Sequence, residues 1–311
     1  MPTRPDLGIQ LGDLKLKNPV LVASGTFGYG QEYAQYFDIS RLGAVVTKSL
    51  SREPRAGNKP PRLVETPAGL LNAIGLQNVG VEAYIAEKLP FLRERKATVI
   101  ANIYGKTVDD YTALAERIEA ANAADAIEAN LSCPNVHDAR QARGVTMVSQ
   151  SPEAILEYTR AIRQATRLPL YAKLTPNVLD IREPALAAEE GGADAVSLIN
   201  TLLGMAVDAE KRRPRLANIV GGLSGPAIRP VAVKLVWDAS QVLRIPIIGI
   251  GGICNAEDAV EFLLAGATAV TVGSMTFRQP DAAMRVLDGL EDYMTRHQFQ
   301  SLDQLIGAMK V

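Results

Sequence analysis

The chain has 311 residues, and its 33 basic and 34 acidic side chains give a formal net charge of -1. This balance argues against a nucleic-acid-binding surface as the main function. No run of apolar residues approaches the roughly 20 that a membrane helix needs, and the first residues lack the apolar segment of a signal peptide. With only two cysteines, the chain suits a reducing compartment, so we expect a cytoplasmic protein with no membrane anchor.

Short β-rich runs alternate with amphipathic stretches along the chain. Eight runs are candidate strands, over residues 20–23, 44–47, 98–101, 126–129, 170–173, 195–199, 247–250 and 269–272. Apolar residues recur at helical spacing most clearly over residues 108–121, 152–165 and 256–265. Eight βα units in order predict an α/β fold, a closed (β/α)8 TIM barrel formed by residues 1–311 as a single domain. A doubly wound open sheet is the structural alternative.

Several segments depart from the βα rhythm. Residues 7–17 precede the first strand and resemble a β-hairpin, which we expect to plug the floor of the barrel. Long insertions follow strands 2, 4 and 6, and those after strands 2 and 6 span residues 49–80 and 201–225. Because these insertions leave the carboxyl ends of strands, where barrel enzymes build their sites, we expect them to be lids or binding loops.

Polar or small residues stand at the ends of all eight candidate strands. They are Ser24 and Gly25, Lys48, Asn102, Asn130, Lys173, Asn200 and Thr201, Gly251 and Gly252, and Gly273 and Ser274. Each could be a simple turn former, but together they indicate a ligand site. The glycines after strands 7 and 8 expose backbone N–H groups and predict a phosphorylated ligand such as a mononucleotide, over which residues 221–225 could close.

Three residues at or near these strand ends, Cys133, Lys48 and Lys173, are candidates for catalysis or ligand binding. Cys133 stands in the polar turn Asn130-Leu131-Ser132-Cys133-Pro134-Asn135, and a working thiol needs such polar neighbours. Lys48 and Lys173 could each form a Schiff base, bind an anion or stabilise negative charge on a cofactor ring. We interpret Cys254 as a packed small side chain. The histidines have no companions at metal-ligand spacing, so no metal is expected.

Three motifs together resemble the dihydroorotate dehydrogenase family. They are Asn130-Leu131-Ser132-Cys133-Pro134-Asn135, Asn72-Ala73-Ile74-Gly75-Leu76-Gln77-Asn78 and Gly221-Gly222-Leu223-Ser224-Gly225-Pro226. The resemblance implies an FMN-binding barrel that oxidises dihydroorotate to orotate in pyrimidine biosynthesis. A cysteine in the first motif is typical of class 1. The segments 75–78 and 173–177 are most similar to the catalytic subunit of subclass 1B, whose members pass electrons to NAD through a partner subunit.

The resemblance also implies roles for matching residues. Cys133 would be the catalytic base that takes the proton from C5 of dihydroorotate while C6 gives hydride to flavin N5. Lys48 would face the substrate carboxylate, and Lys173 would lie by the flavin N1/O2 edge. The implied substrate-binding residues are Lys48, Asn72, Ala73, Ile74, Gly75, Leu76, Asn130, Asn135, Asn200 and Thr201. The implied FMN-binding residues are Ser24, Lys48, Ser49, Asn102, Asn130, Lys173, Ile199, Gly225, Gly251, Gly252, Gly273 and Ser274.

The partners implied by the resemblance are a second copy of the chain, as a homodimer, and an electron-transfer subunit with FAD and a 2Fe-2S cluster. The two cysteines of this chain are too few to hold such a cluster. The sequence leaves three electron acceptors open, namely NAD reached through that subunit, fumarate and a quinone. The chain departs from the family at residues 137–147, which lack the expected Gly-Gly and Phe-Gly elements, and at Gly273-Ser274-Met275, where Gly-Thr-Ala is usual.

Other functions are also compatible with parts of the pattern. A tRNA-dihydrouridine synthase would need a basic face that the charge balance does not supply. A dihydropyrimidine dehydrogenase-type FMN barrel is closer, although Lys48 favours a substrate with a carboxylate. A non-catalytic flavin-binding scaffold is the alternative outside enzymes, and Cys133, Lys48 and Lys173 argue against it.

Overall fold

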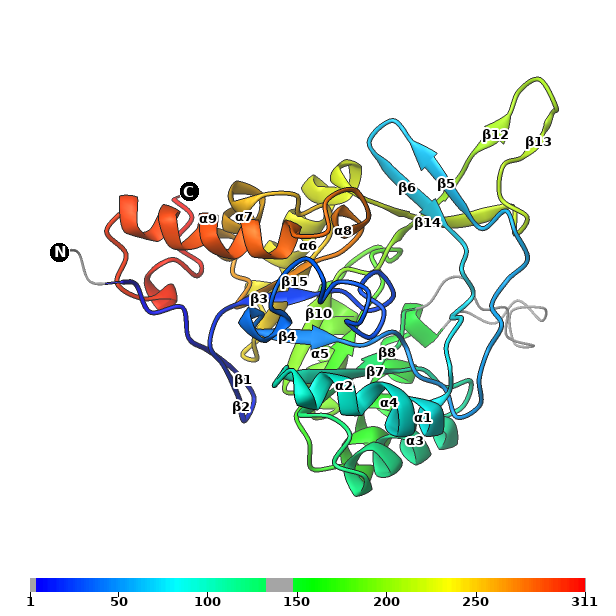
Figure 1. The fold of residues 1–311 in the computed structure, drawn as a ribbon, viewed down its shortest axis with the longest axis horizontal. Coiled ribbons are helices and arrows are strands. Elements are labelled where there is room, and N and C mark those ends of the chain that lie inside the picture. Colours follow the sequence, from blue (N-terminus) through cyan, green and yellow to red (C-terminus); the bar gives the residue numbers. More distant parts are fainter. Residues whose placement is uncertain (1–3, 133–147, 311) are drawn as a thin grey trace.

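The computed structural model describes residues 4–132 and 148–310, and its centre is a closed barrel of eight parallel strands (Figure 1). In barrel order the strands are β3 (Val20–Val22), β4 (Ala44–Val46), β7 (Val99–Ile103), β8 (Ala126–Asn130), β9 (Leu170–Lys173), β10 (Ala195–Leu198), β15 (Ile247–Ile250) and β16 (Ala269–Val272). Val270 of β16 pairs with Val20 of β3 and closes the barrel. The predicted (β/α)8 barrel is therefore confirmed, and the open-sheet alternative is excluded.

Helices follow the strands and pack around the barrel. They are α1 (Val81–Ala83), α2 (Leu89–Glu94), α3 (Val108–Ala120), α4 (Pro152–Ala165), α5 (Arg182–Glu190), α6 (Arg229–Ser240), α7 (Ala256–Leu264), α8 (Met275–Arg278) and α9 (Ala282–Arg296), with a π-helical turn at Tyr84–Lys88 and 3₁₀ turns at Ile39–Arg41, Val148–Gln150, Pro226–Ile228 and Leu302–Gln304. The side chains of Thr107, Ser151 and Asn255 cap α3, α4 and α7 by accepting hydrogen bonds from the backbone. The three helices expected from sequence start at the predicted residues. Within the described residues, no helix is both long and apolar enough to cross a membrane.

A hairpin closes the amino-terminal end of the barrel. It consists of β1 (Ile9–Leu11) and β2 (Leu14–Leu16), which pair antiparallel. Leu11 is fully buried, and its carbonyl accepts a hydrogen bond of 3.1 Å from the hydroxyl of Tyr171, a residue of barrel strand β9. The predicted floor plug is therefore present, and it anchors the end of the barrel opposite the candidate site.

The insertions after barrel strands 2 and 6 join into one antiparallel sheet, the small sheet. Its strands, in the order β11-β14-β6-β5, are β11 (Leu202–Met205), β14 (Val220–Ser224), β6 (Gly69–Asn72) and β5 (Leu63–Thr66). We expected lids or binding loops, and the structure shows that the two insertions pair with each other, Gly222 of β14 with Asn72 of β6. Gly222 is required there, because a Cβ atom would lie 2.0 Å from the hydroxyl oxygen of Thr201.

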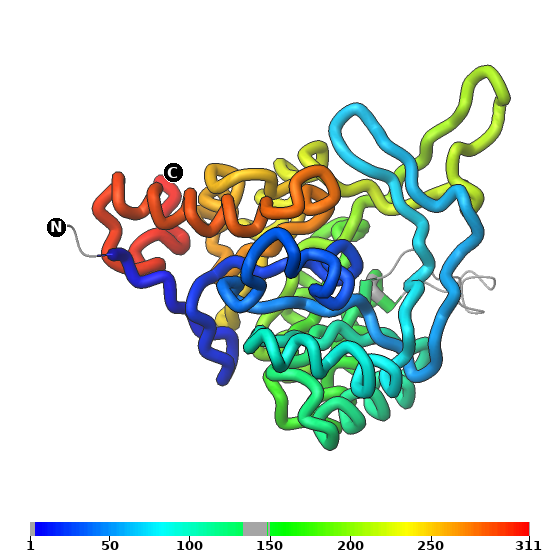
Figure 2. The backbone as a smooth tube through the Cα atoms, viewed as in Figure 1, coloured from blue at the N-terminus to red at the C-terminus, as the bar shows by residue number. Residues whose placement is uncertain are grey.

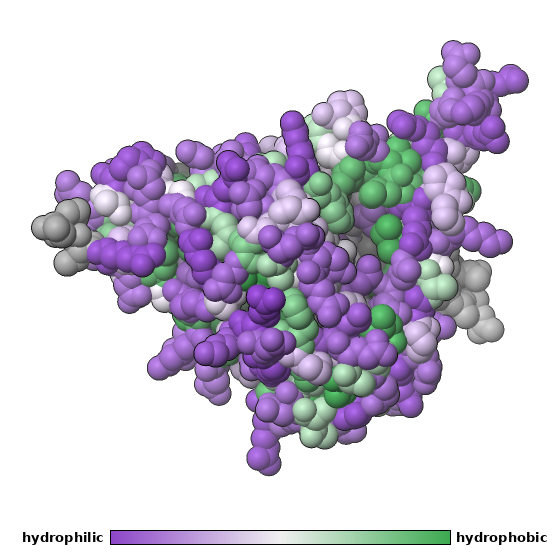
Figure 3. Space-filling view, in the orientation of Figure 1, coloured by the Kyte–Doolittle hydropathy of each residue, from purple (hydrophilic) through white to green (hydrophobic). Residues whose placement is uncertain are grey.

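The small sheet stands out from the barrel, as the tube in Figure 2 shows. One side covers a separate apolar cluster of Val64, Leu71, Ala73 and Leu216. A further hairpin of β12 (Val207–Asp208) and β13 (Arg213–Pro214) extends beside it. In Figure 3 the tip of this hairpin is hydrophilic, and hydrophobic surface lies near the base of the projecting hairpins. The insertion predicted after strand 4 falls largely outside the described residues.

Candidate active site

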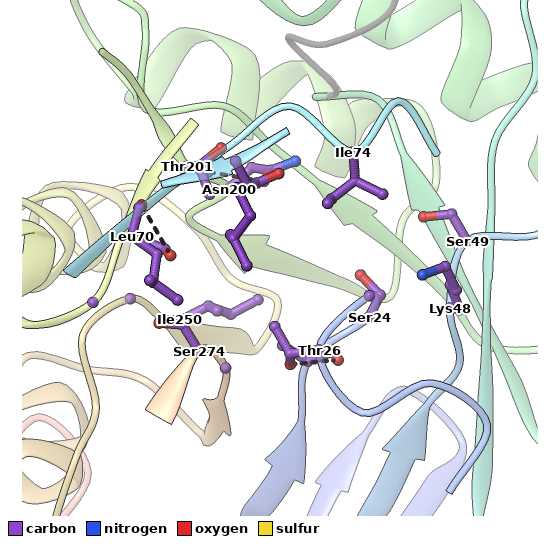
Figure 4. A pocket seen from close by; sticks show the side chains of 18 of the residues that line it. Ser24, Thr26, Lys48, Ser49, Leu70, Ile74, Asn200, Thr201, Ile250 and Ser274 are labelled. Carbon is purple, nitrogen blue, oxygen red and sulfur yellow. Dashed lines mark hydrogen bonds between the residues drawn. The ribbon is translucent and has the colours of Figure 1, made fainter. Parts of the chain in front are cut away.

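A cavity of about 400 Å³ opens at the carboxyl ends of the barrel strands, next to the small sheet (Figure 4). This volume lies within the range of small-molecule sites, about 300–1,000 Å³. The predicted site residues that line it are Ser24, Lys48, Ser49, Asn72, Ile74, Gly75, Leu76, Asn130, Lys173, Ile199, Asn200, Thr201, Gly225, Gly251, Gly252, Gly273 and Ser274. The fold thus brings together residues that are up to about 250 positions apart in the sequence, because parallel strands end at one edge of the barrel.

Two of the predicted site residues that the structure describes, Ala73 and Asn102, do not line this cavity, and two others are not described. Cys133 and Asn135 lie outside the described residues. Ala73 is fully buried in the apolar cluster of the small sheet. Asn102 is fully buried inside the barrel, because β7 runs to Ile103 instead of ending at residue 101 as predicted.

Glycine residues form one end of the cavity. Gly252 has a φ of +75°, and a Cβ atom there would lie 2.8 Å from the carbonyl oxygen of Gly225. At Gly25 a Cβ atom would meet nothing within 4 Å, so a side chain would project into the open cavity. The backbone is therefore exposed at this end, in the arrangement that can cradle an anion with N–H groups.

An ion pair with a buried carboxylate, which the sequence did not reveal, supports the glycine turn. The carboxylate of Asp258 accepts a hydrogen bond of 2.8 Å from the backbone N–H of Cys254, and it pairs with the guanidinium of Arg229. Arg229 also lies 3.2 Å from Glu261. These residues lie in α6 and α7, where a sequence pattern does not distinguish a buried charge from a solvated one. Burial raises the pKa of the Cys254 thiol, in keeping with a packed side chain.

A second buried network lies below the cavity, inside the barrel. Lys173 places its ammonium 3.2 Å from the hydroxyl of Ser24 and 3.8 Å from the carboxylate of Glu128. That carboxylate also accepts hydrogen bonds of 2.6 Å from the amide of Asn102 and 2.8 Å from the hydroxyl of Ser197. We did not predict Glu128 as a site residue. The available signal was an acidic residue in an otherwise apolar strand, two positions before Asn130.

Amide side chains form the other end of the cavity. Asn130 donates to the hydroxyl of Ser49 at 3.3 Å and accepts a hydrogen bond of 3.0 Å from the hydroxyl of Ser132. Asn200 donates to the same Ser132 hydroxyl at 2.8 Å, which links β8 to the end of β10. Asn177, which we did not predict, donates to the carbonyl of Thr201 at 3.2 Å. These bonds fix several amides around the cavity.

Lys48 faces this end from the side opposite Asn200 and Thr201 (Figure 4). Its side chain is half-buried. Burial, assisted by the positive charge of Arg62, lowers the pKa of Lys48 below the ordinary value of 10.5. A half-desolvated ammonium lacks part of its hydration, so it gains from an anionic ligand. Among the described residues there is no cluster of side chains that could hold a metal ion.

The fold and the site together define a (β/α)8-barrel enzyme with two cations and an exposed backbone cradle at the strand ends. The family model for dihydroorotate dehydrogenase matches residues 7–294. The chain belongs to this family of flavin-dependent oxidoreductases, which oxidise dihydroorotate to orotate in pyrimidine biosynthesis.

Curated relatives support the same family over nearly the full chain. The chain is 52% identical over 308 residues to "Dihydroorotate dehydrogenase B (NAD(+)), catalytic subunit" of Geotalea daltonii, covering 99% of each chain. It is 50% identical over 307 residues to the protein of the same name in Alkaliphilus oremlandii, covering 99% of this chain and 100% of the relative. These relatives are of type B, as the sequence motifs predicted.

A solved structure shows the same fold. It is the dihydroorotate dehydrogenase of Eimeria tenella in complex with ferulenol, with a TM-score of 0.79 and 23% sequence identity. The match covers 97% of this chain and 88% of the other. The chain therefore shares its overall fold with that structure.

Proposed function

We propose that this chain is the catalytic subunit of a class 1B enzyme that binds FMN in the cavity and oxidises (S)-dihydroorotate to orotate. The observation that carries the proposal is the single cavity that gathers Lys48, Lys173, the amides and the glycines at the barrel strand ends. The proposal treats residues 1–311 as one FMN-binding domain. It rests on family membership and on this gathering of polar groups.

The residues at the cavity fit FMN. The glycine end offers backbone N–H groups to a phosphate, and Gly225, Gly251, Gly252, Gly273 and Ser274 would hold it. Asn102, which the resemblance also assigns to FMN, has a buried Oδ1 atom without a hydrogen-bond partner among the described residues, next to the network that holds Lys173. Lys173 would hold positive charge beside the ring system. When bound, FMN supplies a two-electron acceptor for the substrate.

The other end of the cavity fits the substrate. Lys48 would bind the carboxylate of dihydroorotate, and Asn72, Asn130, Asn200 and Thr201 would hydrogen-bond the pyrimidine ring. Amide side chains suit this ring because it presents both donors and acceptors. Cys133 would remove the proton from C5, with Asn135 nearby in sequence. The backbone of residues 74–76 would complete the substrate contacts.

We further propose two protein partners. The relatives named above are catalytic subunits, which supports a separate electron-transfer subunit with FAD and a 2Fe-2S cluster, and NAD as the final acceptor. Leu203, Met205 and Val220 of the small sheet are 45%, 50% and 39% exposed, and exposed apolar surface of this kind supports a homodimer. We propose that the assembly is cytoplasmic.

Anaerobic mixing of the purified chain with L-dihydroorotate tests the function. We expect the visible absorbance of the flavin to bleach, because the substrate reduces the bound FMN. Bleaching that persists after NAD is added would support the need for a partner subunit, whereas recovery of colour would show that the chain reduces NAD alone. A yellow protein that does not bleach would contradict the dihydroorotate assignment and favour the scaffold or another reduced pyrimidine.

The pKa of Lys48 predicts a pH dependence of ligand binding. The ammonium form binds a carboxylate, and it is lost as the pH rises through the pKa. Because that pKa is lowered, we expect orotate affinity to fall in the pH range below the ordinary lysine pKa of 10.5, earlier than it would with an unperturbed lysine. Titration of the flavin absorbance with orotate measures this. Lys48→Arg keeps its charge over this range, so its affinity should not vary with pH in this way; a matching decline in both proteins would remove Lys48 from the role.

A further inference from the structure

Glu128 is the one carboxylate that contacts Lys173 in the part of the chain that the structure describes. Its side chain is 2% exposed and that of Lys173 is 6% exposed, so both charges are almost removed from water. The carboxylate does not line the cavity, whereas Lys173 does. Glu128 therefore lies behind Lys173 as seen from a bound ligand.

Stability alone does not explain a buried ion pair at this position. Replacing such a pair by well-packed apolar residues is often neutral or stabilising, because desolvation offsets the attraction between the charges. Ala126, two positions earlier on the same face of β8, is fully buried, which shows that this face of the strand accepts an apolar side chain. A role in the function of the site is therefore the stronger explanation.

The partners of Glu128 indicate that role. They come from three strands: Asn102 from β7, Lys173 from β9 and Ser197 from β10. A carboxylate only accepts hydrogen bonds, so the Asn102 amide must turn its NH₂ group toward Glu128. This orientation leaves the Asn102 oxygen as the free acceptor, without a partner among the described residues. One carboxylate thus sets the orientation of an amide and the position of a cation.

We propose that Glu128 is a positioning residue that holds Lys173 and Asn102 for the flavin and offsets part of the positive charge that Lys173 presents to it. The inference rests on the proposed binding of FMN in this cavity. Lys173 is nearer the cavity than Glu128, so the pair leaves a net positive field at the ring. Removing the negative charge would strengthen that field, and reduced, anionic flavin would become more stable relative to the oxidised form.

Glu128→Gln tests the proposal, because glutamine keeps the shape and an acceptor oxygen but not the charge. We expect FMN to stay bound and its midpoint potential to rise. A tenfold gain in affinity for reduced over oxidised FMN equals about 30 mV for a two-electron couple, and a rise of at least this size is expected. Spectroelectrochemical titration of the FMN-loaded chain measures the potential without any turnover.

Asp194→Asn is the matched control. Asp194 also pairs with a cation, with its carboxylate 2.9 Å from Arg163, but it precedes β10 at the opposite end of the barrel. The Asp194→Asn substitution should leave the midpoint potential of the bound FMN unchanged. A Glu128→Gln protein with bound FMN and an unaltered potential would overturn the inference and leave the proposed function intact. A wild-type chain that binds no FMN would instead contradict the proposed function.

A second comparison covers the case in which Glu128→Gln does not fold. Lys173→Gln should lower the potential, since it leaves Glu128 unopposed. Adding Glu128→Gln to that variant removes the remaining charge and should raise the potential again, toward the wild-type value. A double variant whose potential is no higher than that of Lys173→Gln would overturn the role of Glu128.

Discussion

Replacing Cys133 by serine is expected to leave FMN bound and to slow flavin reduction by dihydroorotate by about 10²- to 10⁴-fold, the usual contribution of a general base. A cysteine thiol with an ordinary pKa of about 8.5 supplies some thiolate at neutral pH, whereas a serine hydroxyl ionises far less readily. Single-turnover measurements under anaerobic conditions separate this step from substrate binding. Orotate affinity should change little, because the amides and Lys48 remain.

Ser132, the last described residue before Cys133, contacts amide side chains that line the cavity. Ser132 is buried, and its hydroxyl both donates to Asn130 and accepts from Asn200, two residues that line the cavity. The segment that carries Cys133 therefore starts at the substrate end. Cys254→Ser is the matched control, since its thiol is half-buried and outside the proposed substrate contacts, and its reduction rate should stay normal. Equal rates for Cys133→Ser and wild type would exclude Cys133 as the base.

The barrel could be predicted from sequence because its signals are local. Each strand and its following helix fall within a short window, and the site follows from the rule that parallel strands end together. The small sheet could not be predicted in this way. Asn72 and Gly222 are 150 residues apart, and no local pattern states that two insertions on different strands will pair. The resemblance implied a substrate contact at Ala73, but it gave no sign that this residue packs into the core of that sheet.

The charged groups behind the site were missed for a different reason. Asp258 looks like any other acidic residue of a helix, and Glu128 is marked only by its place in an apolar strand, because burial is a property of the tertiary structure. Asn102 was predicted at the site but placed just past a strand, and its true position inside the barrel follows from one extra pair of strand residues. Patterns of residue type thus identified the residues that line the cavity better than the buried residues behind them.

Replacing Gly252 by alanine is expected to weaken FMN binding by roughly 10- to 100-fold, equivalent to one hydrogen bond to a charged group at about 1.5–3 kcal/mol. The new Cβ atom would lie 2.8 Å from the carbonyl oxygen of Gly225 and 3.0 Å from the backbone nitrogen of Arg229. Both neighbours are backbone atoms, so the turn itself must move. The N–H groups of the phosphate cradle would move with it. Titration of the FMN-free chain with FMN measures the loss.

Gly307→Ala separates this effect from backbone strain alone. Gly307 has a φ of +70°, close to the +75° of Gly252, but a Cβ atom there would meet nothing within 4 Å. Both variants should lose stability because alanine is strained at positive φ, by about 1–3 kcal/mol. Only Gly252→Ala should also lose FMN affinity, because only there does the added methyl collide with the backbone that faces the phosphate. If both variants bound FMN as the wild type does, the glycine end of the cavity would not be the phosphate cradle.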